Sequence, residues 1–368
     1  MKRANLPTGL ALAALIVSAV ALSPSARQAA KPAVENDATQ ERLDRYLRKS
    51  MNRDFACSVL VARNDQVILR AGYGWLDDAG TVPATEKTLY NIASITKSFT
   101  AIATLQLLER GLARLDDPLS RFFPRAPDDK ARITVEQLLV HASGLGQNYA
   151  ADGIGDRNRA VAAILNDSLK FKPGTDFSYS NENYELLAAV TEVATGQPFE
   201  RFVRERVLEP AGMTDTLFWD ETRDHHHPRI APFTRPLNAT QRLRNWGFIG
   251  SGGIFSNVVD LHRWFAAVEG GRLLTPESRE AMWTPRRQLS DTSVALGWFV
   301  SKAPDGTPEI WTRGTEDFGH NAVLRWFPGR RLLVIVQTNS GEGGDRNITG
   351  NRYIGDALVK MLFEDPYR

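Results

Sequence analysis

A serine and a lysine three residues apart, Ser94 and Lys97, have the types and spacing that nucleophilic chemistry needs. They open an apolar run that extends to Leu108 and reads as a helix. Residues i and i+3 of a helix share a face about one turn apart, so the hydroxyl and the amine can meet. A lysine desolvated enough to lose its proton near neutral pH can activate such a serine. By itself the pattern is more often a helix N-terminus with a solvated lysine, so the rest of the chain has to decide.

A tyrosine and an asparagine two residues apart, Tyr179 and Asn181, form a second candidate. They follow the turn signal Lys172-Pro173-Gly174-Thr175 and precede a helical pattern at 182–195. In an extended segment, residues two apart project to the same side. Tyr179 could then shuttle a proton at a serine, and Asn181 could hold a substrate amide or the lysine. In isolation a simpler interpretation is preferred, with Asn181 as a helix N-cap and Tyr179 as a packing residue.

A third candidate is Arg313-Gly314-Thr315, at the end of a strand-like run. A cation beside a glycine lets a substrate carboxylate and a backbone approach closely. The alternative is a turn that carries a surface arginine.

In this order, the three motifs resemble those of the serine β-lactamase and penicillin-binding-protein superfamily. The tyrosine in the second motif is similar to that of class C β-lactamases, D-alanyl-D-alanine carboxypeptidases and esterases of the same fold. Further segments resemble family loops, and together the similarity covers roughly residues 41 to 345. These segments are residues 138–145, 177–184, 208–216 and 251–256.

The resemblance implies a role for each matching residue. Ser94 would be the acylated nucleophile and Lys97 its base or proton relay. Tyr179 would share proton transfer and help to activate the deacylating water, and Asn181 would bind the substrate amide and contact Lys97. The backbone N–H groups of Ser94 and Glu316 would form the oxyanion hole. No metal or other cofactor is needed.

One departure from the family pattern concerns the substrate. The third motif usually begins with Lys or His and ends in Gly, whereas this chain has Arg313, Gly314 and Thr315. Arginine supplies a fixed charge but no proton relay, and Thr315 adds bulk where a substrate strand would pass. We therefore expect D-Ala-D-Ala-type peptides or small esters to be better substrates than β-lactams. The alternative is a catalytically silent protein that binds penicillin or peptidoglycan, but such a protein would be expected to lack Ser94, Lys97 or Tyr179.

Histidines offer two other hypotheses. His141 and His320 could form a Ser-His arrangement, but the Gly-x-Ser-x-Gly elbow of α/β-hydrolases is absent. His320 follows the third motif closely and is expected to line the site. The run His225-His226-His227 could suggest a metal site, but three consecutive imidazoles cannot all face one ion, and an exposed loop is favoured.

The expected elements divide into two strand-rich zones around a helical middle. Residues 56–75 predict two strands joined at Asn64-Asp65, and four more strands are expected at 296–300, 309–313, 321–327 and 332–338. Helical patterns occupy 94–110, 134–141, 157–169, 182–195, 198–208, 258–268, 276–283 and 353–363. This order predicts an α+β fold, in which an antiparallel sheet is flanked by helices and an all-helical region is inserted between the strands.

The N-terminus has the outline of a secretory signal peptide. Lys2 and Arg3 precede an apolar stretch from Leu10 to Leu22, and cleavage after Ser23 or Ala26 is plausible. We expect a signal peptide at 1–26, a linker at 27–40 and one hydrolase domain at 41–368, with its sheet region at about 41–90 and 290–368 and its helical region at about 91–289. The protein would be periplasmic or secreted, without stable membrane insertion after cleavage. The alternative is an uncleaved anchor, although the run is short for a span of ~20 residues.

Charge and cysteine content limit the partners. Lys and Arg total 45 against 43 Asp and Glu, a net charge of +2, and no basic cluster marks a nucleic-acid surface. The single cysteine, Cys57, can form no intramolecular disulfide and is expected in a buried strand. The predicted partner is a small-molecule or peptidoglycan-derived substrate. The sequence carries no signal for an oligomeric state.

Overall fold

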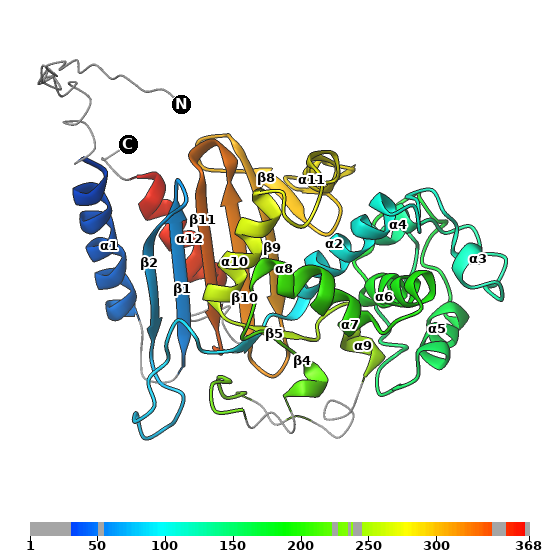
Figure 1. Ribbon diagram of the computed structural model, residues 1–368, viewed down its shortest axis with the longest axis horizontal. Coiled ribbons are helices and arrows are strands. Elements are labelled where there is room, and N and C mark those ends of the chain that lie inside the picture. Colours follow the sequence, from blue (N-terminus) through cyan, green and yellow to red (C-terminus); the bar gives the residue numbers. More distant parts are fainter. Residues whose placement is uncertain are drawn as a thin grey trace, which may run out of the picture.

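The computed structural model describes residues 31–50, 55–222, 227–234, 237, 245–340 and 351–364. Its main feature is an eight-stranded antiparallel sheet (Figure 1). In spatial order the strands are β2 (Gln66–Tyr73), β1 (Cys57–Arg63), β11 (Leu332–Thr338), β10 (Asn321–Phe327), β9 (Pro308–Thr315), β8 (Phe299–Lys302), β7 (Ser293–Val294) and β6 (Arg287–Gln288). A small second sheet has the order β3 (Tyr90–Asn91), β5 (Ile254–Ser256) and β4 (Leu217–Phe218). The predicted α+β class is confirmed.

The first hairpin forms at the predicted place. Asn64 and Asp65 have φ angles of 51° and 64°, the left-handed pair that a two-residue type I′ turn requires. The turn lets β1 and β2 pair from Arg63 and Gln66 back to Cys57 and Tyr73. Because β1 also pairs with β11, the two distant strand zones of the sequence join in one sheet.

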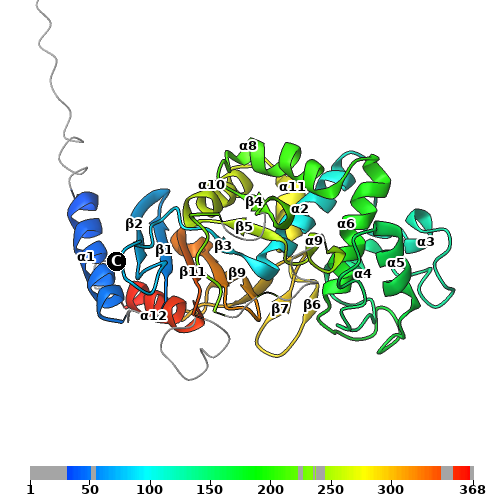
Figure 2. The same ribbon diagram turned by 90° about the horizontal axis from the view of Figure 1, so that it is seen from below.

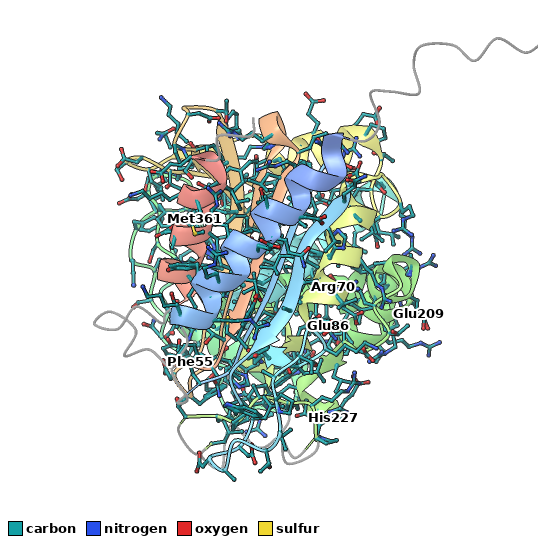
Figure 3. All side chains as sticks on the ribbon, turned by 90° about the vertical axis from the view of Figure 1, so that its left-hand side faces the viewer. Phe55, Arg70, Glu86, Glu209, His227 and Met361 are labelled. Atoms are coloured by element: carbon teal, nitrogen blue, oxygen red, sulfur yellow. The ribbon has the colours of Figure 1, made fainter. Side chains whose placement is uncertain are left out.

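Two terminal helices cover the outer face of this sheet. Helices α1 (Lys31–Ser50) and α12 (Asn351–Phe363) pack on β1, β2, β10 and β11, and Figure 3 looks onto this face. Leu43 and Leu47 of α1 are fully buried there. Residues 31–40 of the expected linker are instead helical, and residues 27–30 lie outside the described residues. Alanine, glutamate and glutamine are good helix formers, so a helix anchored by these leucines extends back through them.

The inner face of the sheet meets the helical region (Figure 2). Helices α2 (Thr96–Glu109) and α10 (Val258–Glu269) lie nearest the sheet. The remaining α-helices are α3 (Leu119–Phe122), α4 (Val135–Leu139), α5 (Arg157–Asn166), α6 (Asn181–Thr195), α7 (Phe199–Val203), α8 (Glu209–Ala211), α9 (Trp246–Ile249) and α11 (Pro276–Trp283). Short helical turns are η2 (Ala93–Ile95), η3 (Arg204–Leu208), η4 (Trp219–Glu221) and η5 (Pro328–Arg330).

The boundaries of several predicted elements differ. The strand expected at 296–300 begins only at Phe299, because Gly297 adopts a φ of 79° and packs against the backbone of α2. The helix expected at 198–208 continues from α7 into η3, a π-helical turn. The helix expected at 94–110 begins with the 3₁₀ turn η2 before α2. No helix in the described ranges is long and apolar enough to cross a membrane, and the predicted signal peptide lies outside them.

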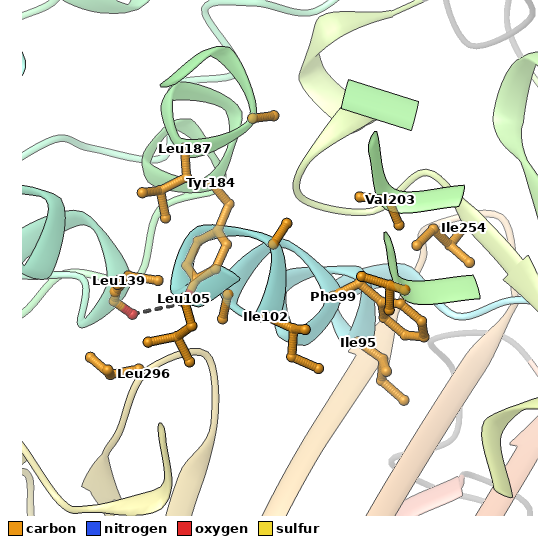
Figure 4. Close-up of a cluster of buried hydrophobic side chains, with 14 of the residues drawn as sticks. Ile95, Phe99, Ile102, Leu105, Leu139, Tyr184, Leu187, Val203, Ile254 and Leu296 are labelled. Atoms are coloured by element: carbon orange, nitrogen blue, oxygen red, sulfur yellow. Dashed lines mark hydrogen bonds between the residues drawn. The ribbon is translucent and has the colours of Figure 1, made fainter. Parts of the chain in front are cut away.

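Helix α2 is the centre of the larger core. It is apolar on nearly all sides, as expected of a helix enclosed between a sheet and other helices. Phe99 stacks on Trp264 with ring centroids 4.2 Å apart, and Trp264 stacks in turn on Trp298. Tyr184 of α6 closes the other end, where its hydroxyl donates to the Leu139 carbonyl at 2.7 Å (Figure 4). This packing fixes the first turn of α2, which carries Lys97, and the adjoining turn η2, which carries Ser94.

Replacement of Phe99 by alanine tests this packing. The side chain is fully buried, so Phe99→Ala should lower the free energy of unfolding by about 3–5 kcal/mol in urea denaturation. Val193→Ala, at a position on α6 that is 40% exposed, should change it by less than about 0.5 kcal/mol. Equal losses in the two variants would contradict the assignment of α2 as the core.

Candidate active site

Lys97 and Ser94 meet as their spacing predicts. The Lys97 Nζ lies 3.0 Å from Ser94 Oγ, 2.8 Å from Asn181 Oδ1 and 2.9 Å from the Ser251 carbonyl oxygen. Lys97 is only 4% exposed. Three acceptors match the three N–H donors of an ammonium. A neutral amine can instead donate to Asn181 and Ser251 and present its lone pair to the Ser94 hydroxyl. The same geometry therefore serves both protonation states of a general base.

The turn η2 sets the direction of Ser94. Ala93 has a φ of 47°, a left-handed conformation that is rare for a residue other than glycine. The Asn91 side chain holds it there, because its Oδ1 accepts the Ala93 N–H at 2.7 Å and its Nδ2 donates to the Gly252 carbonyl. No sequence pattern predicts this strained residue directly before the candidate nucleophile.

The second motif also reaches the site. Ser180 is the N-cap of α6 in an extended conformation, and its hydroxyl points inward to the Gly146 carbonyl and Glu182. Its neighbours Tyr179 and Asn181 therefore project to the opposite side, where Tyr179 borders the same small pocket as Ser94 and Lys97. The Tyr179 ring also lies 5.0 Å from Lys97 Nζ. The alternative that Asn181 is the N-cap is wrong, since it is the first residue of the helix.

His141 supports the tyrosine from behind. It is 3% exposed, and its ring lies 4.4 Å from that of Tyr179. Its Nδ1 lies 3.2 Å from both the Ser180 N–H and the Asn183 amide nitrogen, which fits an acceptor nitrogen of neutral imidazole. Burial, and then the charge of Lys97, lower the pKa of His141 to about 3. His141 is therefore a positioning residue, and it makes no hydrogen bond with a serine hydroxyl.

The third motif is arranged differently from the prediction. Side chains of directly opposed residues share one face of a sheet, and Arg313 pairs with Val323, which packs on the outer face with α12. The Arg313 side chain therefore leaves β9 on the face opposite Ser94, where its guanidinium lies 5.8 Å from the Trp311 ring. Thr315 has the same parity. Arg313 and Thr315 nevertheless border the cleft, because the opening of the cleft extends to the end of β9.

Thr312 and Gly314 occupy the face toward Ser94. Thr312 is buried, and its hydroxyl accepts from Ser98 at 3.2 Å. A Cβ at Gly314 would lie 2.1 Å from the Ile92 oxygen and 2.7 Å from the Ser94 nitrogen. Gly314 is thus the glycine that lets β9 approach η2. A third motif that ends at this glycine consists of Thr312, Arg313 and Gly314. Its first residue is therefore a threonine, where the family pattern has a lysine or histidine.

The second oxyanion donor also changes. The Glu316 N–H donates to the His320 carbonyl at 2.9 Å, so it is already used within the sheet. The direction of the N–H groups alternates along β9, so the Thr315 N–H points away from β10. On that side of β9 the pairing with β8 ends at Trp311 and leaves the strand without a partner at Thr315. The Ser94 nitrogen lies close to this strand, 2.7 Å from where a Cβ at Gly314 would stand. The candidate donors are therefore the N–H groups of Ser94 and Thr315.

His320 does not line the cleft. It is fully buried, where its Nδ1 accepts the Asn91 N–H and its Nε2 lies 2.9 Å from the Ala231 carbonyl. His320 thereby helps to hold Asn91, which in turn holds Ala93. The prediction that His320 lines the site is wrong. His320 follows the third motif closely in sequence, but the chain turns back into β10 directly after Gly319.

The cleft above Ser94 has a volume of about 650 Å³. Besides Ser94, it is lined by residues of three kinds. The aromatic ones are Tyr149, Phe177, Tyr179, Phe248, Phe299, Trp311 and Phe318; the charged ones are Asp152, Arg313, Glu316 and Asp317; the other residues include Gln147, Asn181, Ser251, Gly252 and Thr315. The sequence did not single out Tyr149 or Asp152, which come from the loop that precedes α5.

No cluster of metal-ligating side chains occurs in the part of the chain that the structure describes. Of the three consecutive histidines, only His227 falls in that part, and its Nδ1 accepts the Arg229 N–H. Cys57 is fully buried in β1 as predicted, and burial raises the pKa of its thiol.

A buried carboxyl group lies behind the lysine. Glu185 of α6 is 2% exposed, its Oε1 lies 3.4 Å from Ser251 Oγ and its Oε2 has no hydrogen-bond partner. Burial, and then the charge of Glu182, raise its pKa well above the usual value, while Lys97 acts in the opposite direction. A protonated Glu185 leaves Lys97 without a neighbouring carboxylate that would hold the ammonium form.

Replacement of Glu185 by glutamine tests its protonation. A carboxyl group whose pKa is raised by folding stabilises least at high pH, because the unfolded chain releases its proton above about 4.5. Glu185→Gln should therefore raise Tm relative to the parent protein at pH 7.5, and the gain should shrink toward pH 4.5. Glu280→Gln, at an exposed site, is the matched control. A gain that is the same at both pH values would contradict a protonated Glu185.

Replacement of Gly314 tests the close approach of β9. In Gly314→Ala the new methyl group forces the backbone of β9 away from Ser94. A misplacement of about 1 Å can cost roughly 10²-fold in rate, so modification of Ser94 by a fluorophosphonate should slow by at least that factor. Gly329→Ala, where a Cβ meets its neighbours at ordinary distances of 3.7–3.8 Å, should react at the parent rate. An unchanged rate in Gly314→Ala would refute the role of this glycine.

Comparisons with known proteins concern the family and the fold of the whole chain. The protein named "Putative penicillin-binding protein PbpX", from Bacillus subtilis (strain 168), is 25% identical over 315 residues, which are 85% of this chain and 78% of PbpX. The octameric penicillin-binding protein homologue from Pyrococcus abyssi has a TM-score of 0.75 at 24% identity, over 89% of this chain and 78% of that one. EstCE1, a hydrolase with promiscuous acyltransferase activity, has a TM-score of 0.75 at 19% identity, over 90% of this chain and 100% of that one.

The two solved structures show the fold. The family follows from a sequence model described as Beta-lactamase, which matches residues 43–359 and so includes every residue of the site. The predicted resemblance is confirmed: the chain belongs to the β-lactamase family of serine hydrolases.

Proposed function

We propose that this protein is an exported serine hydrolase that works through an acyl-enzyme on Ser94. The observation that carries the proposal is the triple contact of Lys97 with Ser94, Asn181 and the Ser251 carbonyl. A lysine held this way can accept the Ser94 proton without a change of position. Export rests on the signal-peptide pattern at 1–26, which lies outside the described residues.

The acylation step follows from the positions of these groups. Ser94 Oγ forms a bond to the substrate carbonyl carbon while Lys97 takes the hydroxyl proton. The N–H groups of Ser94 and Thr315 stabilise the oxyanion that develops, a contribution worth about 3–4 kcal/mol per donor in such sites. Collapse of the intermediate breaks the bond to the leaving group, which receives a proton by way of Tyr179. The product is an ester between the acyl group and Ser94.

Deacylation reverses the proton path. Tyr179 and Lys97 take a proton from water, whose oxygen attacks the ester carbon, and the proton returns to Ser94 Oγ as the acid leaves. Asn181 keeps Lys97 in place and is available to a substrate amide. His141 holds the Tyr179 ring by stacking. The full cycle consumes one water.

The substrates that we propose are D-Ala-D-Ala-type peptides and small esters, with β-lactams turned over less efficiently. The arrangement of β9 supports this order, because Thr312 rather than a cation faces Ser94 and the Arg313 side chain starts on the other face. The alternative, a catalytically silent penicillin- or peptidoglycan-binding protein, would acylate without turnover.

Covalent labelling tests the nucleophile. A fluorophosphonate or a fluorescent penicillin should add to Ser94 in the parent protein, as measured by intact and peptide mass spectrometry. Ser94→Ala should not be labelled and should lose roughly 10⁴-fold or more in kcat/KM, as expected when a nucleophile is removed. Ser120→Ala, at an exposed serine of α3, should label normally. Folded parent protein that neither probe labels would refute the assignment.

Turnover distinguishes a serine hydrolase from a catalytically silent binding protein. Hydrolysis of p-nitrophenyl acetate, a D-Ala-D-Ala peptide and nitrocefin should be compared on one preparation. Steady turnover of the ester or the peptide supports the hydrolase. A stable Ser94 adduct with none of the three substrates turned over favours the silent binding protein.

A further inference from the structure

The loop before α5 places one carboxylate in the wall of the Ser94 cleft. Asp152 follows Tyr149, whose carbonyl accepts the Asp152 N–H at 3.0 Å. Tyr149, Asp152 and Ser94 line the same cleft, although the mechanism above uses neither of the loop residues. Tyr149 is held at a φ of 55°, and its side chain is 50% exposed at this position. Such a strained, exposed residue beside a cleft is a reason to look for recognition there.

Among the residues that the structure describes, no cation pairs with the Asp152 carboxylate. Within the described ranges its side chain makes no hydrogen bond and no salt bridge. It lies over α9, where a Cβ at Gly247 would come within 2.0 Å of Asp152 Oδ1. Asp152 remains exposed to solvent on the cleft side, while partial desolvation, and then the charge of Glu182, raise its pKa to about 6. A carboxylate in such surroundings gains from a cation that approaches from the cleft.

The cleft contains little positive charge that could serve instead. Among its described lining residues the acids are Asp152, Glu316 and Asp317, and the one base is Arg313. The Arg313 side chain leaves β9 on the opposite face and lies by Trp311. Lys97 is buried and donates to its three acceptors. The charge of this wall therefore suits a substrate with a positive group.

The remaining lining suits the same substrate. Tyr149 and Phe177 flank the loop side, and Phe299 and Trp311, stacked at 4.7 Å, line the cleft from β8 and β9. Aromatic faces attract cations and also bury apolar groups. A substrate that combines an ammonium group with an apolar or aromatic body would satisfy both the carboxylate and the rings.

We propose that Asp152 is a specificity-determining residue that binds the ammonium group of an amine-bearing ester or amide. The proposal rests on the proposed function of Ser94 and names the substrate class of that site. Asp152 contacts the amine and takes no part in the bond-making steps. Its contribution is the same in the ground state and the transition state, so it should appear mainly in KM.

A pair of esters that differ only in the amine provides the test. Phenylalanine ethyl ester, as each enantiomer, is compared with ethyl 3-phenylpropanoate, and products are measured by chromatography at pH 7.5. The parent protein should prefer one phenylalanine ester over the neutral ester by roughly tenfold or more in kcat/KM, the effect of one charged hydrogen bond. Asp152→Asn should abolish this preference through a higher KM for the amine ester.

Two further variants make the result specific. Asp128→Asn removes the same charge at an exposed site outside the cleft lining and should keep the preference. Gly247→Ala displaces the Asp152 carboxylate and should weaken the preference without a change of charge. Thermal unfolding of each variant confirms that it is folded.

The outcomes distinguish this proposal from the one on which it rests. A parent protein that hydrolyses these esters with no preference for the amine, or an Asp152→Asn variant that keeps the preference, overturns the role of Asp152 alone. A folded parent protein that hydrolyses neither these esters nor p-nitrophenyl acetate overturns the hydrolase function itself.

Discussion

The Lys97 amine joins three segments that are far apart in the chain. Its partners come from η2, from the first residue of α6 and from the turn after α9. A buried amine without partners would cost several kcal/mol, so these acceptors have to be in place for α2 to occupy the core. In return the lysine fixes the distance between the candidate nucleophile and the second motif. The same three contacts of Lys97 are therefore needed both for the core packing of α2 and for the chemistry at its first turn.

The surrounding structure keeps this lysine in a setting where it can work as a base. Glu185 is buried close behind it, and burial raises the pKa of its carboxyl group. Burial, and then the charge of Lys97, lower the pKa of His141 to about 3. No salt bridge joins Lys97 to a carboxylate among the described residues. The stacking of His141 on Tyr179 shows how a buried histidine can orient a site without sharing in its proton transfer.

Close backbone approaches complete the arrangement. Gly314 brings β9 against η2, and Gly297 brings the segment before β8 against the first turns of α2, at distances that any side chain would prevent. The Ser94 N–H and the Thr315 N–H can therefore face one point beside the Ser94 hydroxyl. The Asn91 and His320 pair holds the strained Ala93 from the other side. Preorganised donors of this kind stabilise charge without reorganisation during the reaction.

The sequence by itself determined the α+β class, the hairpin at Asn64-Asp65 and the meeting of Ser94 with Lys97, whereas the expected roles of Tyr179 and Asn181 came from the family resemblance. These features depend on local periodicity and on spacing of two to three residues, which a sequence displays directly. Only the tertiary structure decided that Arg313 faces away from Ser94, that Thr315 rather than Glu316 offers the free N–H, and that His320 is buried. The reason is that a strand alternates its side chains and its hydrogen bonds at every residue, so a shift of one position reverses both, and the register is set by pairing with β10. The place of Asp152 in the cleft was likewise decided by packing between segments almost a hundred residues apart, which no local pattern records.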